Sequence, residues 1–366
     1  MENKKVLIIL NDLGGGGAER VFVNIANNFV SAGIETEMLV GTKEGVYLEI
    51  LNPKISVHDL SATNFLQYKK KLPAFLKNKT YTHIFTTRDY TSAATIMAKR
   101  KLKLQVSVIA TLHYNLYNSL KKLSRSYGIL LKYLNKGYIA KANRIVAVSN
   151  GVAEGFRKVV GAENCRHLQV IYNPVFDDDI YEKARESVRE GFFLNGRTTL
   201  ISVGRIDENK NHSLLIDAFV LASQKNSNLQ LLILGTGSYE GEIRKKISSL
   251  HLQDKVHLLG FQQNPFAYMA KSDLLVLSSL SEGLPTVLIE ALALGVNVVS
   301  TDCPSGPDEI LEQGKYGWLA GNNNADSLSA CILIALSNKY SADFLQKRAL
   351  QFHTISIMPE YLNLLN

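Results

Sequence analysis

An α/β architecture with two doubly wound domains is predicted by three features of the 366-residue sequence. Strand and helix patterns alternate along nearly the whole chain, which is typical of parallel sheets covered by helices on both faces. The strand patterns are short apolar runs, as expected for parallel strands that are buried on both sides. The length, with 46% hydrophobic and 20% charged residues, suits two globular domains and argues against disorder.

The first domain is assigned to residues 1–173. It opens with a buried strand pattern at residues 6–10, followed by a glycine-rich loop and a helical pattern that reaches residue 30. Asn173-Pro174-Val175 interrupts the alternation, and a highly charged stretch follows. We therefore predict a linker over residues 174–196. Further strands of this domain are expected at residues 106–111, 144–148 and 170–171.

The second domain is assigned to residues 197–353. Its first strand pattern, residues 199–203, leads into Gly204 and Arg205, and Lys210 follows five residues after Arg205. Both cations are therefore expected in a loop at the carboxyl-terminal edge of a strand. Two cations in a loop are more often plain solvated charges, so their meaning depends on the residues that accompany them. Further strands are expected at residues 256–259, 274–277 and 297–300.

Residues 281–295 place two carboxylates around the start of a helix, directly after the strand at 274–277. Pro285 suits the first helical position, and Gly295 suits the left-handed position just past the helix end. Such a helix start can hold a phosphate with its free N–H groups and its dipole. Glu290 can bind a vicinal diol such as a ribose, while Glu282 can reach another part of the same ligand. The N–H groups belong to Thr286, Val287 and Leu288.

A purely structural alternative exists for this segment. The helix can be an ordinary amphipathic helix in which Glu290 is solvated and Glu282 acts as a capping acid.

The spacing of these acids resembles a known family. Glu282 and Glu290, with seven residues between them, match the E-x7-E motif of the family 4 retaining glycosyltransferases, which have the GT-B fold. The resemblance extends to Arg205 and Lys210, which match the arginine and lysine that hold the donor diphosphate in that family. It implies two Rossmann-like, doubly wound domains that face a central cleft. It also implies a terminal helix, about residues 354–366, that returns to the first domain.

The resemblance further assigns residues to the donor and the reaction. Arg205, Lys210, Glu282 and His113 are the expected catalytic residues, with His113 lying beside the donor sugar. Cations fixed at a departing diphosphate stabilise the transition state more than the ground state. A lone histidine at a strand end is, by the residues alone, an ordinary loop residue. The remaining substrate-binding residues are Gly15, Gly16, Gly17, Phe261, Gln262, Gly283, Leu284, Pro285, Thr286, Val287, Leu288 and Glu290.

Two further segments match the family. Residues 260–264 resemble the loop that faces the nucleotide base, and residues 305–310 resemble a segment that recurs in polysaccharide-building members. We assign no chemical role to the side chains of the second segment, which can equally be a helix cap.

The glycine loop does not complete a dinucleotide fingerprint. In the two registers that start at Gly14 and Gly15, the last glycine is replaced by Glu19 or by Arg20. An acid at the helix start also repels a pyrophosphate, whereas the suspected family commonly carries a sequence like Gly16 to Arg20. We interpret the loop as a wall that lets a ligand approach the backbone closely, with a flexible turn as the alternative.

No metal or other cofactor is expected. Asp177 and Asp179 have the D-x-D spacing by which another glycosyltransferase class holds a divalent ion, but they lie in the predicted linker, so we favour solvated acids. Cys165, Cys303 and Cys331 are odd in number and contain no C-x-x-C pair, which supports neither a disulfide framework nor a zinc site.

Charge is distributed unevenly. The formal charge is +11 over residues 1–190 and −3 over residues 191–366, and in residues 65–144 Asp89 is the only acid. Such a basic surface attracts anionic membranes, and nucleic acid is disfavoured because no nucleic-acid-binding motif is found. The basic residues include Lys69, Lys70, Lys71, Lys99, Arg100, Lys101, Lys103, Lys121, Lys122 and Arg125. The interleaved apolar residues are Leu66, Tyr68, Leu72, Phe75, Leu116, Tyr117, Leu120 and Leu123.

The sequence contains neither a signal peptide core nor a run of about 20 apolar residues. We expect a cytoplasmic, metal-independent, retaining enzyme attached peripherally to the inner face of the cytoplasmic membrane. It would move a sugar from a nucleotide sugar, most simply a UDP-sugar, to a lipid-linked saccharide in surface polysaccharide synthesis, such as O-antigen or capsule. The alternatives are a nucleotide-sugar epimerase of the same fold and a non-catalytic nucleotide-sugar-binding membrane module.

Overall fold

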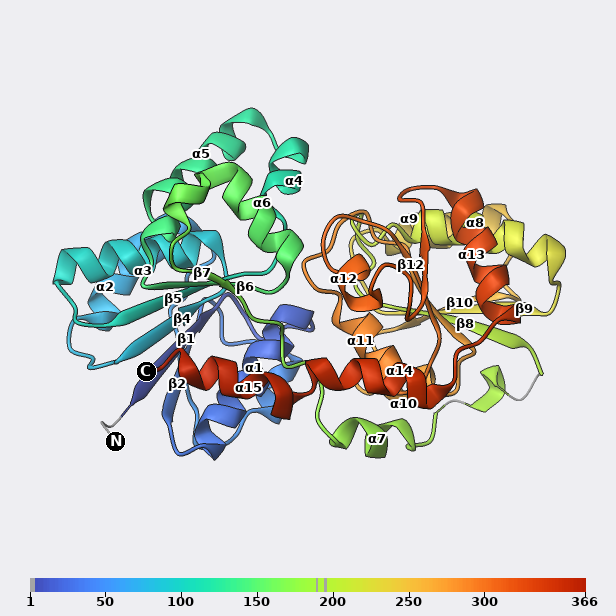
Figure 1. Ribbon diagram of the computed structural model, residues 1–366, viewed down its shortest axis with the longest axis horizontal. Coiled ribbons are helices and arrows are strands. Elements are labelled where there is room, and N and C mark those ends of the chain that lie inside the picture. Colours follow the sequence, from blue (N-terminus) through green and yellow to red (C-terminus); the bar gives the residue numbers. More distant parts are fainter. Residues whose placement is uncertain (1–3, 189, 194–195) are drawn as a thin grey trace. The chain divides into compact units, whose positions relative to one another are not determined.

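The computed structural model describes residues 4–188, 190–193 and 196–366. The chain divides into two units, the first formed by Met1–Pro174 with Ile355–Asn366 and the second by Val175–Thr354. Each unit is an open parallel sheet with helices on both faces (Figure 1). The prediction of two doubly wound α/β domains is therefore confirmed.

Seven parallel strands form the sheet of the first unit, in the order β3-β2-β1-β4-β5-β6-β7. The order reverses between β1 and β4, and doubly wound sheets bind ligands beyond the carboxyl ends of their strands at such a switch point. The strands are β1 Lys5–Leu10, β2 Glu35–Val40, β3 Ser56–Asp59, β4 His83–Thr86, β5 Ser107–Leu112, β6 Arg144–Ala147 and β7 Leu168–Val170.

Several helices of this unit start at polar residues that cap them. Asn64, Asn115 and Ser149 each accept a hydrogen bond from an amide in the first turn of the helix that follows. The α-helices are α1 Gly17–Ser31, α2 Phe65–Leu76, α3 Asp89–Leu102, α4 Leu116–Lys122, α5 Arg125–Gly137, α6 Asn150–Val160 and α15 Thr354–Asn363. The 3-10 helices are η1 Val46–Ile50, η2 Ile139–Lys141 and η3 Ala162–Asn164.

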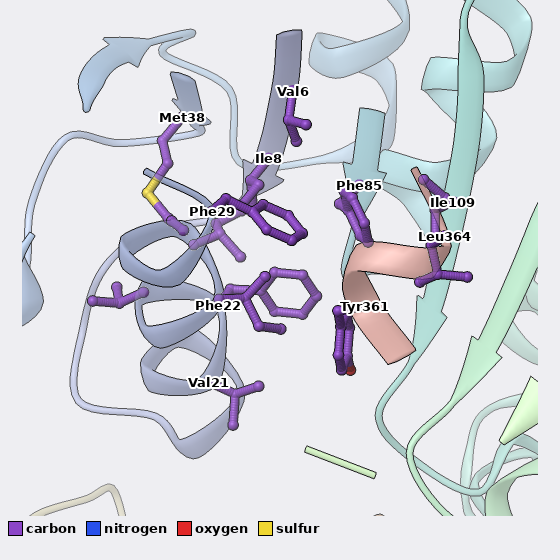
Figure 2. Close-up of a cluster of buried hydrophobic side chains, with 14 of the residues drawn as sticks. Val6, Ile8, Val21, Phe22, Phe29, Met38, Phe85, Ile109, Tyr361 and Leu364 are labelled. Carbon is purple, nitrogen blue, oxygen red and sulfur yellow. The ribbon is translucent and has the colours of Figure 1, made fainter. Parts of the chain in front are cut away.

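The core on one face of the first sheet joins the two ends of the chain. Phe22 and Phe29 of α1 pack against Phe85 of β4, with ring centroids 6.4 and 5.6 Å from it (Figure 2). Tyr361 of α15 lies on the other side of Phe85 at 6.5 Å and is fully buried. The last helix therefore supplies part of this core. The core packs against β1 and β4, the strands that lead into the loops at the switch point.

Six parallel strands form the second sheet, in the order β10-β9-β8-β11-β12-β13, with the switch point between β8 and β11. Its strands are β8 Thr198–Val203, β9 Leu229–Leu234, β10 Val256–Gly260, β11 Leu274–Leu277, β12 Val298–Thr301 and β13 Trp318–Ala320. Its α-helices are α7 Asp179–Ala184, α8 His212–Lys225, α9 Glu240–Ser249, α10 Phe266–Ala270, α11 Thr286–Ala293, α12 Pro307–Leu311, α13 Ala325–Ser337 and α14 Ala342–Ala349. Two 3-10 helices, η4 Glu190–Phe192 and η5 Leu350–Phe352, complete it.

Helices α8, α9 and α13 cover one face of the second sheet, while α10, α11 and α14 cover the other (Figure 1). Phe219 of α8 and Ile332 of α13 are fully buried against strand residues such as Leu231. Because all eight residues of α11 except Thr286 are buried, this short helix is fixed by packing and not by its own propensity.

The segment assigned to a linker, residues 174–196, groups with the second unit from Val175 onward. The main chain of this stretch pairs with the end of the same unit, because Val175 N donates to Phe352 O and Thr354 N donates to Phe176 O. Asn264 Nδ2 also donates to Lys183 O at 2.7 Å, which ties α7 to the loop before α10. Residues 189, 194 and 195 of this segment lie outside the described residues.

Candidate active site

The switch point of the second sheet brings together the loops after β8 and β11. Lys210 Nζ, from the first loop, lies 2.6 Å from Glu282 Oε1 in the second, and their side chains are only 20% and 12% exposed. Two residues that the sequence assigns to different parts of one ligand therefore form an ion pair with each other. A partly buried pair of this kind is screened less by salt than a surface pair.

Three hydrogen bonds connect these loops independently of the ion pair. Leu280 N donates to Asn209 O at 2.8 Å, and Asn209 Nδ2 donates to Ser281 O at 2.7 Å. Ser278 Oγ donates to Lys210 O at 2.8 Å. Lys210 and Glu282 are thus held in place by main-chain contacts, so their geometry is set before any ligand arrives.

Arg205 is the solvent-exposed cation of this group. Its side chain is 69% exposed, and its Nε lies 3.6 Å from Asp207 Oδ2. Asp207 Oδ1 accepts from Lys210 N at 3.0 Å, so one aspartate contacts both cationic residues. The structure therefore places Arg205 and Lys210 in one loop, as predicted, with Lys210 fixed and Arg205 open to solvent.

A glycine pair after β9 shapes this loop and was not singled out from the sequence. A Cβ atom on Gly235 would lie 1.9 Å from Gly204 O, and one on Gly237 would lie 2.2 Å from Ile206 O. Gly235 also has a φ of +132°, which disfavours any other residue. The sequence could have indicated this pair, because a G-x-G sequence directly follows the apolar strand pattern at 229–234.

The start of α11 differs from the prediction in two details. The helix begins at Thr286, and Pro285, with a ψ of 99°, is the extended residue before it. Leu288 N donates to Pro285 O at 3.1 Å, so this N–H is consumed by an i→i+3 turn. The predicted phosphate seat therefore reduces to the amides of Thr286 and Val287. Gly295 has a φ of +71° just past the helix, as predicted.

Glu290 lies on α11 and is only 6% exposed. The alternative of a solvated Glu290 on an amphipathic helix is therefore wrong, because both faces of α11 are covered. Burial of a carboxylate costs several kcal/mol unless it is compensated by hydrogen bonds or charges.

The loop after β10 contributes an exposed ring. Phe261 is 46% exposed. Gln262 Nε2 donates to Leu259 O at 2.7 Å, so this amide nitrogen stabilises its own turn. Gly260 O also accepts from Gly235 N, which joins this loop to the glycine pair. The predicted base-facing role can therefore involve the Phe261 ring, main-chain groups and the second N–H of Gln262 Nε2.

A pocket of about 390 Å³ lies beside this group without containing its key residues. It is lined by residues 206–208 and 211–213, by residues at the start of α9 and along it, and by Leu280 and Asn323. Lys210, Glu282 and Glu290 are not among its lining residues. Burial lowers the pKa of His212 in this pocket to about 4. We do not assign the donor to this pocket, because its charged lining is mainly acidic.

In the first unit, the glycine loop follows β1 at the switch point. Gly16 precedes α1, and a Cβ atom there would lie 2.0 Å from Glu19 Oε2. Glu19 therefore folds back over the helix start, where its side chain is 12% exposed and 3.3 Å from Arg88 Nη2. Gly16 makes room for Glu19, whereas Gly15 and Gly17 are exposed and remain available to a ligand. The acid at the helix start also speaks against a pyrophosphate seat there.

His113 follows β5 and is neutral at physiological pH. Burial and the charge of Arg88 lower the pKa of His113 to about 3. Thr111 Oγ1 donates to Thr86 O at 2.8 Å, so at its 3.0 Å contact with His113 it acts as acceptor and Nε2 carries the proton. The other nitrogen, Nδ1, is then a hydrogen-bond acceptor, and the ring packs edge-on against Phe22 at 5.5 Å.

The polar neighbours of His113 are structural. Tyr114 donates to Asp89 Oδ2, and Asn135 Nδ2 donates to Asp89 Oδ1 at 2.9 Å. Burial raises the pKa of Asp89, and these two hydrogen bonds oppose that effect. Asn115 caps α4. The loop after β5 is therefore tied to α3 and α5, with the His113 ring held against α1.

The basic surface of the first unit differs from the prediction in its apolar part. Tyr68 and Leu72 are fully buried and Leu116 is 3% exposed, so these residues belong to the core and cannot contact a membrane. Tyr68 OH donates to Leu10 O at 3.0 Å. The α2 lysines Lys69, Lys70 and Lys71 and the α4 lysines Lys121 and Lys122 are exposed.

Helix α5 carries an apolar surface that the sequence analysis missed. Its residues Tyr127, Ile129, Leu130 and Tyr133 are 47%, 61%, 39% and 58% exposed. The exposed cations Arg125, Lys132 and Lys136 share this helix. We call these seven residues the α5 surface. None of the helices in the described ranges is both long enough and apolar enough to span a bilayer.

No group of three or more His, Cys, Asp or Glu side chains within residues 4–188, 190–193 and 196–366 is arranged to hold a metal ion. In the D-x-D stretch, burial together with the hydrogen bond and charge of Asp179 raises the pKa of Asp177 to about 6. Asp178 lies 3.3 Å from His353 Nε2, so the three acids have partners inside their own unit.

Burial and the charge of Glu282 raise the pKa of Cys303 to about 12, so its thiol is protonated.

The two sheets define a protein with two Rossmann-like domains, and comparison with known proteins identifies its family. The family profile "Glycosyltransferase Family 4" matches residues 15–179, and "Glycosyl transferases group 1" matches residues 184–352. A Campylobacter jejuni N-acetylgalactosamine-N,N'-diacetylbacillosaminyl-diphospho-undecaprenol 4-alpha-N-acetylgalactosaminyltransferase is 30% identical, over 89% of this chain and 88% of that protein. The chain belongs to glycosyltransferase family 4.

Solved structures agree on the fold. Anabaena HepE in complex with UDP and glucose matches 99% of both chains with a TM-score of 0.83 at 20% identity. Staphylococcus aureus TarM matches with a TM-score of 0.76 at 15% identity, over 99% of this chain and 100% of that chain. The fold is therefore GT-B, as the resemblance implied. Because the relatives are transferases, the epimerase and the non-catalytic module are not favoured.

Proposed function

We propose that the chain is a retaining, metal-independent glycosyltransferase that moves a sugar from a UDP-sugar to a lipid-linked glycan. The observation that carries this proposal is the fixed Lys210–Glu282 pair at the switch point of the second sheet, on the loop that leads into α11 with its buried Glu290. A nucleotide sugar needs a cation at its diphosphate and acceptors at its hydroxyl groups, and these residues supply both.

Each residue has a proposed part of the donor. Lys210 and Arg205 bind the diphosphate, helped by the amides of Thr286 and Val287. Glu290 accepts hydrogen bonds from the ribose diol. Glu282, whose Oε1 holds Lys210, accepts hydrogen bonds from the transferred sugar on its other carboxylate oxygen. Phe261 and the main chain of its loop contact the base.

The bond changes balance without a metal or a redox partner. The anomeric C–O bond to the diphosphate breaks, and a bond from the acceptor hydroxyl oxygen forms on the same face of the sugar. The departing phosphate oxygen takes the proton of the acceptor. Negative charge grows on the diphosphate during this step, and Lys210 and Arg205 stabilise it in place of a metal ion.

The first unit is proposed to bind the acceptor. Gly15 and Gly17 leave the main chain accessible at the switch point, and His113 offers Nδ1 as a neutral hydrogen-bond acceptor for a sugar hydroxyl. Two Campylobacter jejuni relatives, the one described above and a second at 25% identity, act by their names on undecaprenol-linked saccharides. A lipid-linked saccharide of surface polysaccharide synthesis is therefore the proposed acceptor.

Peripheral attachment to the inner face of the cytoplasmic membrane follows from such an acceptor. The α5 surface combines exposed apolar and aromatic residues with cations, which is the composition of an interfacial membrane anchor. The exposed lysines of α2 and α4 add attraction of roughly 1 kcal/mol per well-placed residue towards anionic lipids. The enzyme is thereby proposed to work from the cytoplasmic side.

The test is product analysis with a panel of UDP-sugars and a bacterial lipid extract. UDP-N-acetylgalactosamine is the first donor to examine, because both Campylobacter relatives are named for that sugar. We expect a glycolipid heavier by one sugar, an α-configured new linkage in its NMR spectrum, and full activity in EDTA. A β-linked product contradicts retention, loss of activity in EDTA contradicts metal independence, and lack of transfer from every UDP-sugar contradicts the donor class.

A further inference from the structure

The segment between β12 and α12, which the sequence analysis left without a role, contacts the loop between β11 and α11. We call this loop, residues 278–285, the donor loop. Ser305 and Gly306 adopt φ angles of +69° and +95°, and Pro307 starts α12. Only glycine adopts such angles without strain, so Gly306 suits this turn for conformational reasons. Gly306 is also required for steric reasons, because the turn before α11 lies against it.

Gly306 touches the turn that leads from Glu282 into α11. A Cβ atom on Gly306 would lie 2.4 Å from Pro285 Cδ, 3.1 Å from Gly283 O and 3.2 Å from Leu284 Cα. One step earlier, Glu282 N donates to Pro304 O at 3.2 Å. Residues 304–306 therefore contact four consecutive residues of the turn, beginning with the Glu282 backbone.

The far end of α12 is fixed by Arg348 of α14. Its side chain is 5% exposed, and it donates from Nε to Ile310 O at 2.8 Å and from Nη2 to Glu309 O at 2.6 Å. A guanidinium on the last carbonyls of a helix satisfies groups that the helix leaves unpaired. Nη1 also lies 2.7 Å from Glu312 Oε1. The segment that touches the donor loop is thus held by a buried, multiply bonded side chain.

We propose that Gly306 is a positioning residue that sets the location of the Glu282 carboxylate relative to the donor sugar. This inference rests on the proposed function, in which Glu282 binds the transferred sugar. Glu290 and the amides of Thr286 and Val287 belong to α11, whose side chains are buried. The Lys210 loop is held by hydrogen bonds to Ser278, Leu280 and Ser281, which lie outside the displaced residues. Displacement of residues 282–285 therefore affects the sugar contact more than the nucleotide contacts. The expected signature is a loss of turnover without a loss of UDP affinity.

The experiment compares Gly306→Ala with Gly314→Ala. Gly314 has a similar φ of +91° just after the same helix, but the nearest atom to its Cβ position is 3.6 Å away. Both variants therefore carry backbone strain, and only Gly306→Ala pushes on the donor loop. Calorimetric titration with UDP, steady-state transfer from the donor found in the product analysis, and thermal unfolding are measured for each.

We expect Gly306→Ala to lower kcat by roughly tenfold to a hundredfold, as small misplacements of a reacting group do. The Kd for UDP should change less than twofold. Gly314→Ala should lower the unfolding temperature by a similar amount while kcat stays within twofold. The double variant Gly306→Ala with Pro285→Ala removes the atom that clashes most, so it should recover part of the lost kcat.

Unchanged kcat in Gly306→Ala overturns the inference, and so does a parallel loss of kcat and UDP affinity. Should that variant not fold, Arg348→Lys loosens the same segment from its other end, and unchanged kcat there overturns it equally. Glu282→Gln separates the inference from the proposed function. If Glu282→Gln loses turnover and Gly306→Ala does not, only the inference fails; if Glu282→Gln is fully active, the sugar role of Glu282 fails.

Discussion

The strand-edge loops of the two units differ in how they use charge. In the second unit, Lys210 and Glu282 form a partly buried ion pair on loops that are joined by one main-chain hydrogen bond and two side-chain-to-main-chain hydrogen bonds. In the first unit, Glu19 pairs with the half-exposed Arg88, and His113 is neutral. The same doubly wound fold therefore presents a fixed charged site in one unit and a weakly charged, more open site in the other.

This contrast indicates a division of tasks. A donor diphosphate requires fixed cations, and their loops are organised before binding because reorganisation during the reaction would cost free energy. An uncharged sugar hydroxyl requires an acceptor atom and an accessible backbone, and in the proposed function His113 Nδ1 and the exposed Gly15 and Gly17 take these parts. The fold alone does not decide this difference; the residues after each strand do.

The largest expected effect comes from removal of the fixed cation. Lys210→Ala should reduce kcat/KM by roughly a hundredfold to a thousandfold, because the developing charge loses a preorganised partner and Glu282 loses its own. Lys246→Ala is the matched control, since Lys246 pairs with Asp217 at 2.6 Å on α8 and α9 of the same unit. A loss below tenfold in Lys210→Ala, in steady-state kinetics, would contradict a charged site in this unit.

A smaller effect, on UDP affinity, is expected from a change at Glu290, the residue proposed to bind the ribose. Glu290→Gln should weaken UDP binding at least about tenfold, because charge-assisted hydrogen bonds are worth about 1.5–3 kcal/mol each. Glu240→Gln, on α9 where Glu240 pairs with Arg244, should leave UDP affinity unchanged. The measurement is calorimetric titration with UDP. Equal affinities of the two variants would remove the ribose role.

The exposed apolar residues of α5 in the first unit predict an effect of moderate size on membrane binding. Ile129→Ser with Tyr133→Ser should reduce binding to phosphatidylglycerol vesicles roughly tenfold, because two exposed apolar side chains lose their burial in the interface. Ile334→Ser, at a 48% exposed position on α13 of the second unit, is the control for a general loss of apolar surface. If the two variants bind vesicles equally, α5 is not the membrane contact. UDP affinity should be unaffected in both.

The smallest effect concerns the neutral histidine. The pKa of His113 in the fold, about 3, lies below its ordinary value of about 6.5. Above pH 6.5 both the folded and the unfolded forms are neutral, and between pH 6.5 and 3 the unfolded form binds a proton first. This group therefore lowers the free energy of unfolding as the pH falls, by at most about 1.4 kcal/mol per pH unit.

His113→Gln should make that pH dependence shallower between pH 6 and 4.5, as measured by urea unfolding at several pH values. His251→Gln, at an exposed loop position, should leave the slope unchanged. A slope in His113→Gln that equals the wild-type slope would mean that the imidazole has the same pKa in the folded and the unfolded state, which would contradict a ring held neutral by burial.

The strand patterns predicted most of the sheet cores because a buried parallel strand leaves a short apolar run, as at residues 199–203 and 274–277. Apolar surface residues were predicted less well. Tyr68 and Leu72 are core residues of α2, while Ile129 and Tyr133 are exposed, because amphipathic spacing does not reveal which side of a helix a sheet covers.

The candidate site divides in a similar way. Arg205, Lys210, Glu282 and Glu290 could be selected from spacing and family resemblance. The Lys210–Glu282 contact could not, since it joins residues 72 positions apart. The hydrogen bonds of the Leu288 N–H and of Gln262 Nε2, and the close contacts of Gly306, depend on local turns that composition does not encode.

Hydrogen exchange of the full chain with and without UDP tests the central claim most directly, because it reports which backbone segments a nucleotide covers. We predict slower exchange in residues 204–211 and 282–290, where the charged loops and α11 lie, with residues 14–20 unchanged. Slower exchange confined to residues 14–20, with no change at 282–290, would contradict the assignment of the donor to the second unit.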